Sequence, residues 1–277
     1  MKPFIGSEAL ASGQLTRGQL RWNYKRIHPD VYVAADGNLD PFMRAYGAWL
    51  WTRGEGVVSG LAAAHLHGVH GIPDSTPIEL IGTSRRAPRG VVVRNQRIGS
   101  DEIQTIAGMR VTKPARTALE LARRLPRDEA VVQLDKLAAV ARVDEREVES
   151  LLARYRGARG IARAYPALAL IDGGARNPQE TRLRLLLHDI GLPRPETSIC
   201  LEDRGFVAVL GMGWRGPKVG VSVVLDDDVR HAYLKEQLVR RQAAIQRRRW
   251  IEVEVTSLTP KAAIAHRIRE QLSWRAL

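Results

Sequence analysis

The sequence predicts a multidomain protein that combines α+β and α/β units. The chain has 277 residues, and at roughly 100–200 residues per domain this length favours two or three compact units. Helical and strand patterns both recur along the whole chain, and the pair Gly173-Gly174 marks a boundary. We therefore expect a small unit over 1–45, a mixed α/β domain over 46–174 and a further domain over 175–277.

Residues 1–45 have the order of elements of a winged helix. A helical turn or two over Ser7–Ser12 precedes a helix over Arg17–Asn23, with Thr16 as its N-cap. A β-rich hairpin over Tyr24–Val33 follows, with Pro29-Asp30 as its turn. In a winged helix the second helix enters the major groove and the hairpin contacts phosphate. The candidate DNA contacts of this unit are Arg17, Arg21, Lys25 and Arg26.

The middle region mixes helices and strands and is expected to be mostly scaffold. Pro114 stands at the first position of a predicted helix that continues to Arg124. Apolar periodicity predicts the other elements, which are helices over 45–53, 59–67, 130–140 and 145–155, and strands over 78–81 and 91–94.

The C-terminal region predicts a small three-layer α/β domain. Asn177 can cap a helix that begins at Pro178 and stops at Gly191. Two alternating stretches joined by Arg215-Gly216-Pro217 predict a β-hairpin. A helix containing Leu234, Leu238 and Ile245, a strand over 250–255 and a helix over 260–274 complete the order α, β, β, α, β, α.

The charge of the chain indicates an anionic partner. It carries 43 Lys+Arg against 30 Asp+Glu, for a net charge of +13 and a pI near 10.5. A field of this sign concentrates polyanions, so nucleic acid is the leading candidate, and charge that serves only solubility is the alternative. The basic residues gather at two places, Arg85, Arg86 and Arg89, and then Arg240, Arg241, Arg247, Arg248 and Arg249.

Other classes of protein are excluded by composition. The single cysteine, Cys200, can form neither an intramolecular disulfide nor a cysteine-based zinc site. The segment Met1–Gly13 lacks the apolar run of a signal peptide, and no stretch approaches the ~18 apolar residues of a membrane span. We expect a cytoplasmic protein.

Several motifs carry a resemblance to a known family. The motifs are Pro178-Gln179-Glu180-Thr181, Gly191-Leu192-Pro193-Arg194-Pro195, Leu210-Gly211-Met212-Gly213-Trp214, Arg249-Trp250-Ile251 and Val111-Thr112-Lys113-Pro114-Ala115-Arg116-Thr117. With them the chain resembles actinobacterial proteins whose C-terminal part is similar to a very-short-patch-repair endonuclease of the PD-(D/E)XK class. Residues 1–45 resemble the winged-helix end of the same proteins, which are grouped with AbiEi-type antitoxins of type IV toxin–antitoxin systems.

The resemblance implies a Mg²⁺-dependent nuclease, but the catalytic positions have changed. Where the relatives carry Asp, Glu, Asp and His, this chain has Gly211, Ser222, Val224 and Asp228. If the hairpin is symmetric about Gly216-Pro217, positions 211 and 222 face each other with Cβ atoms about 5 Å apart, where two carboxylates could share one Mg²⁺. Glycine and serine cannot supply that charge, so we expect no intact catalytic residue and no metal.

Two remnants leave an alternative open. Glu180 survives at the helix position of the family, although a capping box with Asn177 explains it equally well. The run Asp226–Asp228 could form a displaced carboxylate cluster, although a solvated turn is its simpler explanation.

The sequence therefore predicts a DNA-binding protein, a transcriptional regulator or antitoxin-like protein with an inactive nuclease-like domain. Arg240, Arg241, Arg247 and Arg248 are expected to follow a DNA backbone along the exposed side of their helix, because Glu236 is the only acid nearby in sequence. The alternatives are a residual metal-dependent endonuclease and a toxin-binding interaction protein that does not bind DNA.

Overall fold

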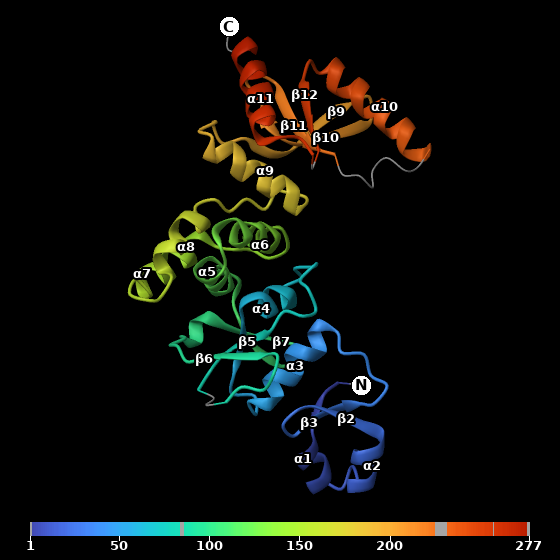
Figure 1. Cartoon of the computed structure of the whole chain (residues 1–277), viewed down its shortest axis with the longest axis vertical. Coiled ribbons are helices and arrows are strands. Elements are labelled where there is room, and N and C mark those ends of the chain that lie inside the picture. Colours follow the sequence, from blue (N-terminus) through green and yellow to red (C-terminus); the bar gives the residue numbers. More distant parts are fainter. Residues whose placement is uncertain (1, 84–85, 225–231, 257, 276–277) are drawn as a thin grey trace. The chain divides into compact units, whose positions relative to one another are not determined.

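The computed structural model describes residues 2–83, 86–224, 232–256 and 258–275. The chain forms two compact units, Met1–Ile171 and Asp172–Leu277 (Figure 1). The first unit contains both the 1–45 region and nearly all of the 46–174 region. That residues 1–45 form a domain of their own stays a prediction.

The N-terminal part of the first unit is two short helices and a small sheet. Its elements are β1 (Phe4–Ile5), α1 (Gly6–Ala11), α2 (Arg17–Asn23), β2 (Tyr24–His28) and β3 (Val31–Ala34), with strand order β1-β3-β2. Thr16 caps α2, since its hydroxyl accepts a hydrogen bond from the Gln19 amide at 3.2 Å. The predicted order of helix, helix and hairpin is present, β1 was not predicted, and the winged-helix assignment stays a prediction.

A five-stranded mixed sheet follows, in the order β6-β5-β4-β8-β7. One buried cluster joins this sheet to α3 and α4, through Ala45 and Ala48 of α3 and Ala62 and Ala63 of α4. Small side chains allow both helices to approach the strands closely. The elements are α3 (Pro41–Trp51), β4 (Val57–Ser59), α4 (Gly60–Leu66), β5 (Ile78–Ile81), β6 (Val91–Arg94), the 3₁₀ turn η1 (Ser100–Glu102), β7 (Ile103–Ile106) and β8 (Met109–Thr112).

Helix α5 is the centre of the helical part of the first unit. Every residue from Ala115 to Arg123 is buried, because α5 packs against α4, α6, α7 and α8. Pro114 stands at its first turn, as predicted. The helices are α5 (Pro114–Arg124), α6 (Arg127–Val140), α7 (Glu145–Arg154) and α8 (Ile161–Leu168).

The second unit is a four-stranded sheet, in the order β12-β11-β10-β9, between two layers of helix (Figure 1). Its elements are α9 (Pro178–Asp189), β9 (Glu196–Asp203), β10 (Phe206–Trp214), β11 (Val219–Val223), α10 (Ala232–Arg247), β12 (Ile251–Val255) and α11 (Lys261–Arg275). Leu183 of α9 and Ile264 of α11 share one buried cluster with the sheet, whereas Ala244 and Ile245 of α10 belong to a second cluster. The predicted three layers are present, β9 was not predicted, and the PD-(D/E)XK assignment stays a prediction.

The turn of the predicted hairpin lies where expected. Met212 pairs with Val221 and Trp214 with Val219 across β10 and β11. These pairs are symmetric about Gly216-Pro217, which confirms the predicted register of the hairpin.

Candidate functional site

Four basic side chains from separate elements of the first unit line one hollow, here called the basic groove. Lys25 and Arg26 come from β2, Arg44 from α3 and Arg89 from the residues before β6. The hollow has a volume of about 360 Å³. Its other lining residues, none of them acidic, are Ile27, His28, Leu39, Ile78 and Gly90.

The hydrogen bonds of the cations in the basic groove go to neutral backbone groups. Lys25 donates a hydrogen bond to the carbonyl of Gly37 at 2.8 Å, and Arg44 donates to the carbonyl of Thr76 at 2.8 Å. Both partners are neutral backbone groups. Among the described residues, none of the four cations forms an ion pair with a carboxylate. Burial, and then the charge of Arg44, lower the pKa of His28 in the same hollow, so the imidazole adds little charge at neutral pH.

Helix α2 exposes the two predicted arginines and one residue that sequence reasoning missed. Arg17 and Arg21 are both exposed, and the Arg21 guanidinium lies 5.6 Å from the centre of the Trp22 ring. The Trp22 side chain is 77% exposed, which is unusual for so large an apolar group. The amide of Thr16 donates to the Gln19 side chain at 2.8 Å, so Gln19 is held in the helix cap.

Arg44 was also missed, and Arg89 was noticed only as part of a basic run. The signal for Arg44 was weak, because a lone arginine in an aromatic helix has no charge pattern around it. The groove is a product of tertiary contact between β2, α3 and the segment before β6.

The prediction for the α10 arginines is corrected by the structure. Arg241 does not lie on the exposed side of the helix, because its side chain is 20% exposed and is paired with Glu252 of β12. Arg247 is paired with Asp203 of β9 at 2.6 Å, and its hydrogen bond lowers the pKa of Asp203. Acids from distant strands thus meet a helix that had only one acid nearby in sequence.

Three of the four predicted arginines, Arg240, Arg247 and Arg248, are exposed. Arg240 pairs with Glu236 at 2.7 Å, one helical turn away, and Arg248 is exposed just beyond the end of the helix. An exposed pair of this kind contributes little stability and leaves the guanidinium accessible. DNA contact through the exposed residues Arg240, Arg247 and Arg248 stays a prediction.

Positions 211 and 222 are adjacent, but each lies beside a different helix. The Gly211 amide donates to the Ser222 hydroxyl at 3.3 Å. A Cβ atom at position 211 would lie 2.9 Å from the Glu180 carboxylate of α9, whereas the Ser222 hydroxyl accepts from Arg241 of α10 at 3.1 Å. Side chains at the two positions would lie beside different helices, which corrects the expectation that they face each other across the hairpin.

Strand β10 changes face at this point. Leu210 packs in the cluster with α10, and Met212 packs in the cluster with α9 and α11. Regular alternation would place both side chains on one face. Because β10 is irregular at Gly211, positions 211 and 222 face different helices even though the hairpin pairs symmetrically.

Glu180 forms only half of the predicted capping box. Its amide donates to the Asn177 side chain at 2.8 Å. Its carboxylate instead accepts from the Arg176 guanidinium at 2.7 and 3.1 Å and from the Arg176 amide at 2.8 Å. The side chain is fully buried, so this arginine neutralises a carboxylate that has no access to water.

These residues do not fit a Mg²⁺ ion. Mg²⁺ requires anionic oxygen ligands in octahedral geometry, but Gly211 supplies none, Ser222 supplies a neutral hydroxyl, and Val224 is a half-buried aliphatic residue on a backbone bonded to Val255. Within residues 2–83, 86–224, 232–256 and 258–275, no group of three His, Cys, Asp or Glu side chains is placed to bind a metal. The predicted cluster Asp226–Asp228 lies outside the described residues.

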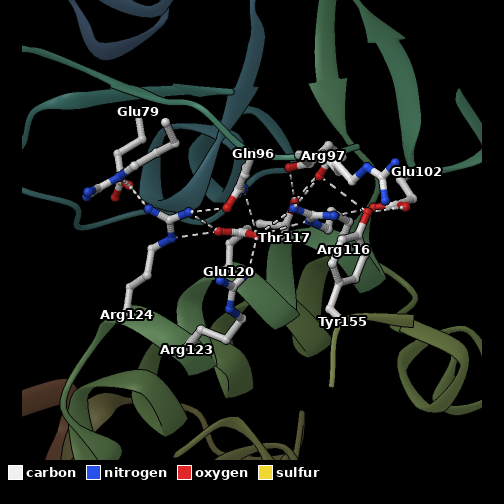
Figure 2. Close-up of polar contacts among 12 residues, drawn as sticks. Glu79, Gln96, Arg97, Glu102, Arg116, Thr117, Glu120, Arg123, Arg124 and Tyr155 are labelled. Atoms are coloured by element: carbon white, nitrogen blue, oxygen red, sulfur yellow. Dashed lines mark hydrogen bonds and ion pairs between the residues drawn. The ribbon is translucent and has the colours of Figure 1, made fainter. Parts of the chain in front are cut away.

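A buried network of arginines and glutamates connects the sheet and helices of the first unit (Figure 2). Arg116 and Glu120 are fully buried, and Arg116 also pairs with Glu102 from the end of η1. Arg124 continues the network to Glu79 of β5 at 3.1 Å. The charged groups of the network are paired with one another in the described part of the chain, so the network joins the sheet to the helices. The sequence signal that could have predicted this network is an arginine and a glutamate four residues apart inside an apolar helix.

Comparison with known proteins places the chain among relatives. Residues 57–170 match the AbiEi antitoxin C-terminal domain. Two proteins of Mycobacterium tuberculosis, Uncharacterized protein MT2308 and Uncharacterized protein Rv2248, are each 32% identical over 208 residues, which is 73% of this chain and 73% of theirs. The chain belongs to the family of these proteins. The buried network, from Glu79 to Tyr155, lies within the residues that match this family model.

A solved structure is also similar. The RV2827C protein from Mycobacterium tuberculosis is 16% identical, with a TM-score of 0.42 over 66% of this chain and 75% of that one. No helix in the described part of the chain is long and apolar enough to span a membrane.

Proposed function

We propose that this chain is a DNA-binding regulator of antitoxin type that contacts DNA through the basic groove and α2. The observation that carries the proposal is the basic groove, where four cations meet without a carboxylate partner in the described structure. The match of residues 57–170 to the AbiEi antitoxin C-terminal domain supports the antitoxin type.

The charge and geometry of the groove suit a phosphate backbone. Lysine and arginine that neutralise phosphates release condensed counterions, which drives association. Helix α2, which carries Arg17 and Arg21, contacts strand β2, which carries Lys25 and Arg26. Arg89 lies inside the AbiEi domain. The proposal therefore gives this domain a share of the DNA contact.

The second unit is proposed to be a nuclease-like fold that binds and does not cut. Its inherited positions Gly211 and Ser222 lack carboxylates, and the nearby acids Glu180 and Glu252 are each paired with an arginine. Such a unit would serve as an interaction surface, for DNA through Arg240 and Arg248 or for a cognate toxin. A cytoplasmic location follows from the proposal.

DNA binding is tested by fluorescence anisotropy with a duplex from upstream of the reading frame and a scrambled duplex, at about 50 and 200 mM salt. The double variant Arg26→Ala/Arg89→Ala should bind both duplexes more weakly. Its plot of log K against log salt should be shallower by about 0.9 for each phosphate that the variant no longer neutralises.

The matched control is Arg142→Ala/Arg163→Ala, which removes the same charge from exposed positions outside the groove. It should retain wild-type affinity. Unchanged binding by the groove variant would refute DNA contact through the basic groove. No binding by the wild type at low salt would refute the proposed function and favour a protein that binds only a toxin. Cleavage of the duplex in Mg²⁺ or Mn²⁺ would favour the residual endonuclease.

A further inference from the structure

Arg241 occupies a site built from oxygen atoms of three strands. The guanidinium donates to the Glu252 carboxylate of β12 at 2.8 Å, to the Ser222 hydroxyl of β11 at 3.1 Å and to the Val209 carbonyl of β10 at 3.4 Å. A second contact to Glu252 makes that pair bidentate. The Arg241 side chain thus connects α10 to three neighbouring strands of the sheet.

The oxygen atoms of this site are removed from water. The Glu252 side chain is 3% exposed and Ser222 is 5% exposed. A buried carboxylate requires a positive partner, since the desolvation penalty of an unpaired charge is several kcal/mol. Among the residues that the structure describes, Arg241 is the only cation paired with Glu252.

Carboxylate, hydroxyl and carbonyl oxygens are the donors that hard divalent cations prefer. Here one guanidinium satisfies all three, and its planar set of donors suits a buried ion pair. We propose that Arg241 is a built-in cation of the second unit, which fills the oxygen site on the α10 side and keeps divalent metal out. The arrangement explains why this unit would hold its sheet and helix together without metal.

The same chemistry recurs on the other helix. Glu180, fully buried beside Gly211, is neutralised by Arg176 at 2.7 Å. Arginine is thus the counter-charge on both sides of the hairpin. The inference concerns only the second unit and stands independently of DNA binding by the first.

The experiment adds a carboxylate to the site and asks which cation takes it. In the full chain, Ser222→Asp alone should bind Mn²⁺ only weakly at this site, because Arg241 pairs with the new carboxylate. Ser222→Asp/Arg241→Ala should bind one Mn²⁺ at least about tenfold more tightly than Ser222→Asp, since two carboxylates then lack a counter-charge. Binding of Mn²⁺ is followed by electron paramagnetic resonance.

Ser222→Asp/Arg248→Ala is the matched control, since Arg248 is exposed and lies outside the site. It should behave as Ser222→Asp does. Equal Mn²⁺ affinity of Ser222→Asp and Ser222→Asp/Arg241→Ala would overturn the proposal, as would a folded double variant that binds none.

A second measurement serves if that variant does not fold. Arg241→Ala and Glu252→Gln should each lower the urea midpoint. The combined variant should lower it by much less than the sum of the two decreases, because it leaves no buried charge unpaired. Additive shifts would show that Arg241 acts only by packing and would overturn the proposal.

Discussion

Arg116 and Glu120 lie one turn apart on α5, both fully buried, with the guanidinium nitrogen 2.8 Å from the carboxylate oxygen. The Arg116 guanidinium also lies 4.4 Å from the centre of the Tyr155 ring, and Tyr155 donates to Glu102 at 2.7 Å. The pair therefore joins α5 to η1 and to the end of α7 (Figure 2). Buried ions of this kind are stable only while each partner is present.

Removing one partner should destabilise the first unit strongly. Glu120→Gln leaves the Arg116, Arg123 and Arg124 guanidinium groups without their shared carboxylate, and we expect a loss of about 3–5 kcal/mol in the free energy of unfolding. Urea denaturation followed by circular dichroism measures the loss. The exposed pair Arg240–Glu236 supplies the control, since Glu236→Gln should cost under about 1 kcal/mol. Equal losses for the two variants would contradict the role given to the network.

The stability of the first unit should decrease as the pH is lowered from 6.5. Burial lowers the pKa of His67 from its usual 6.5, and its hydrogen bond to the Thr112 carbonyl only partly offsets this. The unfolded state therefore binds the proton first, so stability is complete above pH 6.5 and is lost as the pH decreases towards the folded pKa.

Urea midpoints between about pH 7.5 and pH 5 measure this effect. His67→Gln should reduce the dependence on pH, because the amide does not titrate. His188→Gln, at a side chain that is 56% exposed, should keep the wild-type slope. A slope that is the same in His67→Gln as in wild type would show that His67 is not responsible.

Gly160 should not tolerate a side chain. Its φ of +82° is in the left-handed region, and a Cβ atom there would lie 2.4 Å from the carbonyl oxygen of Arg123. We expect Gly160→Ala to lower the free energy of unfolding by about 1–3 kcal/mol. Gly157→Ala is the control, since it has open space and no positive φ. If both variants have the same thermal midpoint, the close approach of α8 to α5 is wrong.

Restoring the acid at position 211 alone should be unfavourable. The new carboxylate of Gly211→Asp would lie beside Glu180, whose Oε1 is 2.9 Å from the Cβ position. Two carboxylates this close repel each other, so Gly211→Asp should be less stable than the isosteric Gly211→Asn by about 1–3 kcal/mol at pH 7. Equal stability of the two variants at pH 7 would place position 211 away from Glu180.

Much of the local structure could be predicted from the chain alone. The Thr16 cap, Pro114 at the start of α5 and the hairpin turn at Gly216-Pro217 depend on residues close in sequence. Strands β4, β7 and β8 were not predicted, because strands of three or four residues are too short to show a clear alternation. The face change at Gly211 was also missed, because the symmetry of the hairpin pairing does not reveal a local irregularity within one strand.

By itself, the sequence determined the mixed fold class, the strong positive charge and the absence of acids at positions 211 and 222. Only the tertiary structure decided what each charge does. It paired Arg241 with Glu252 and Arg247 with Asp203, and it gathered Lys25, Arg26, Arg44 and Arg89 around one hollow. The physical reason is that the effect of a charge depends on burial and on the nearest opposite charge in space, and folding brings together groups that are far apart along the chain.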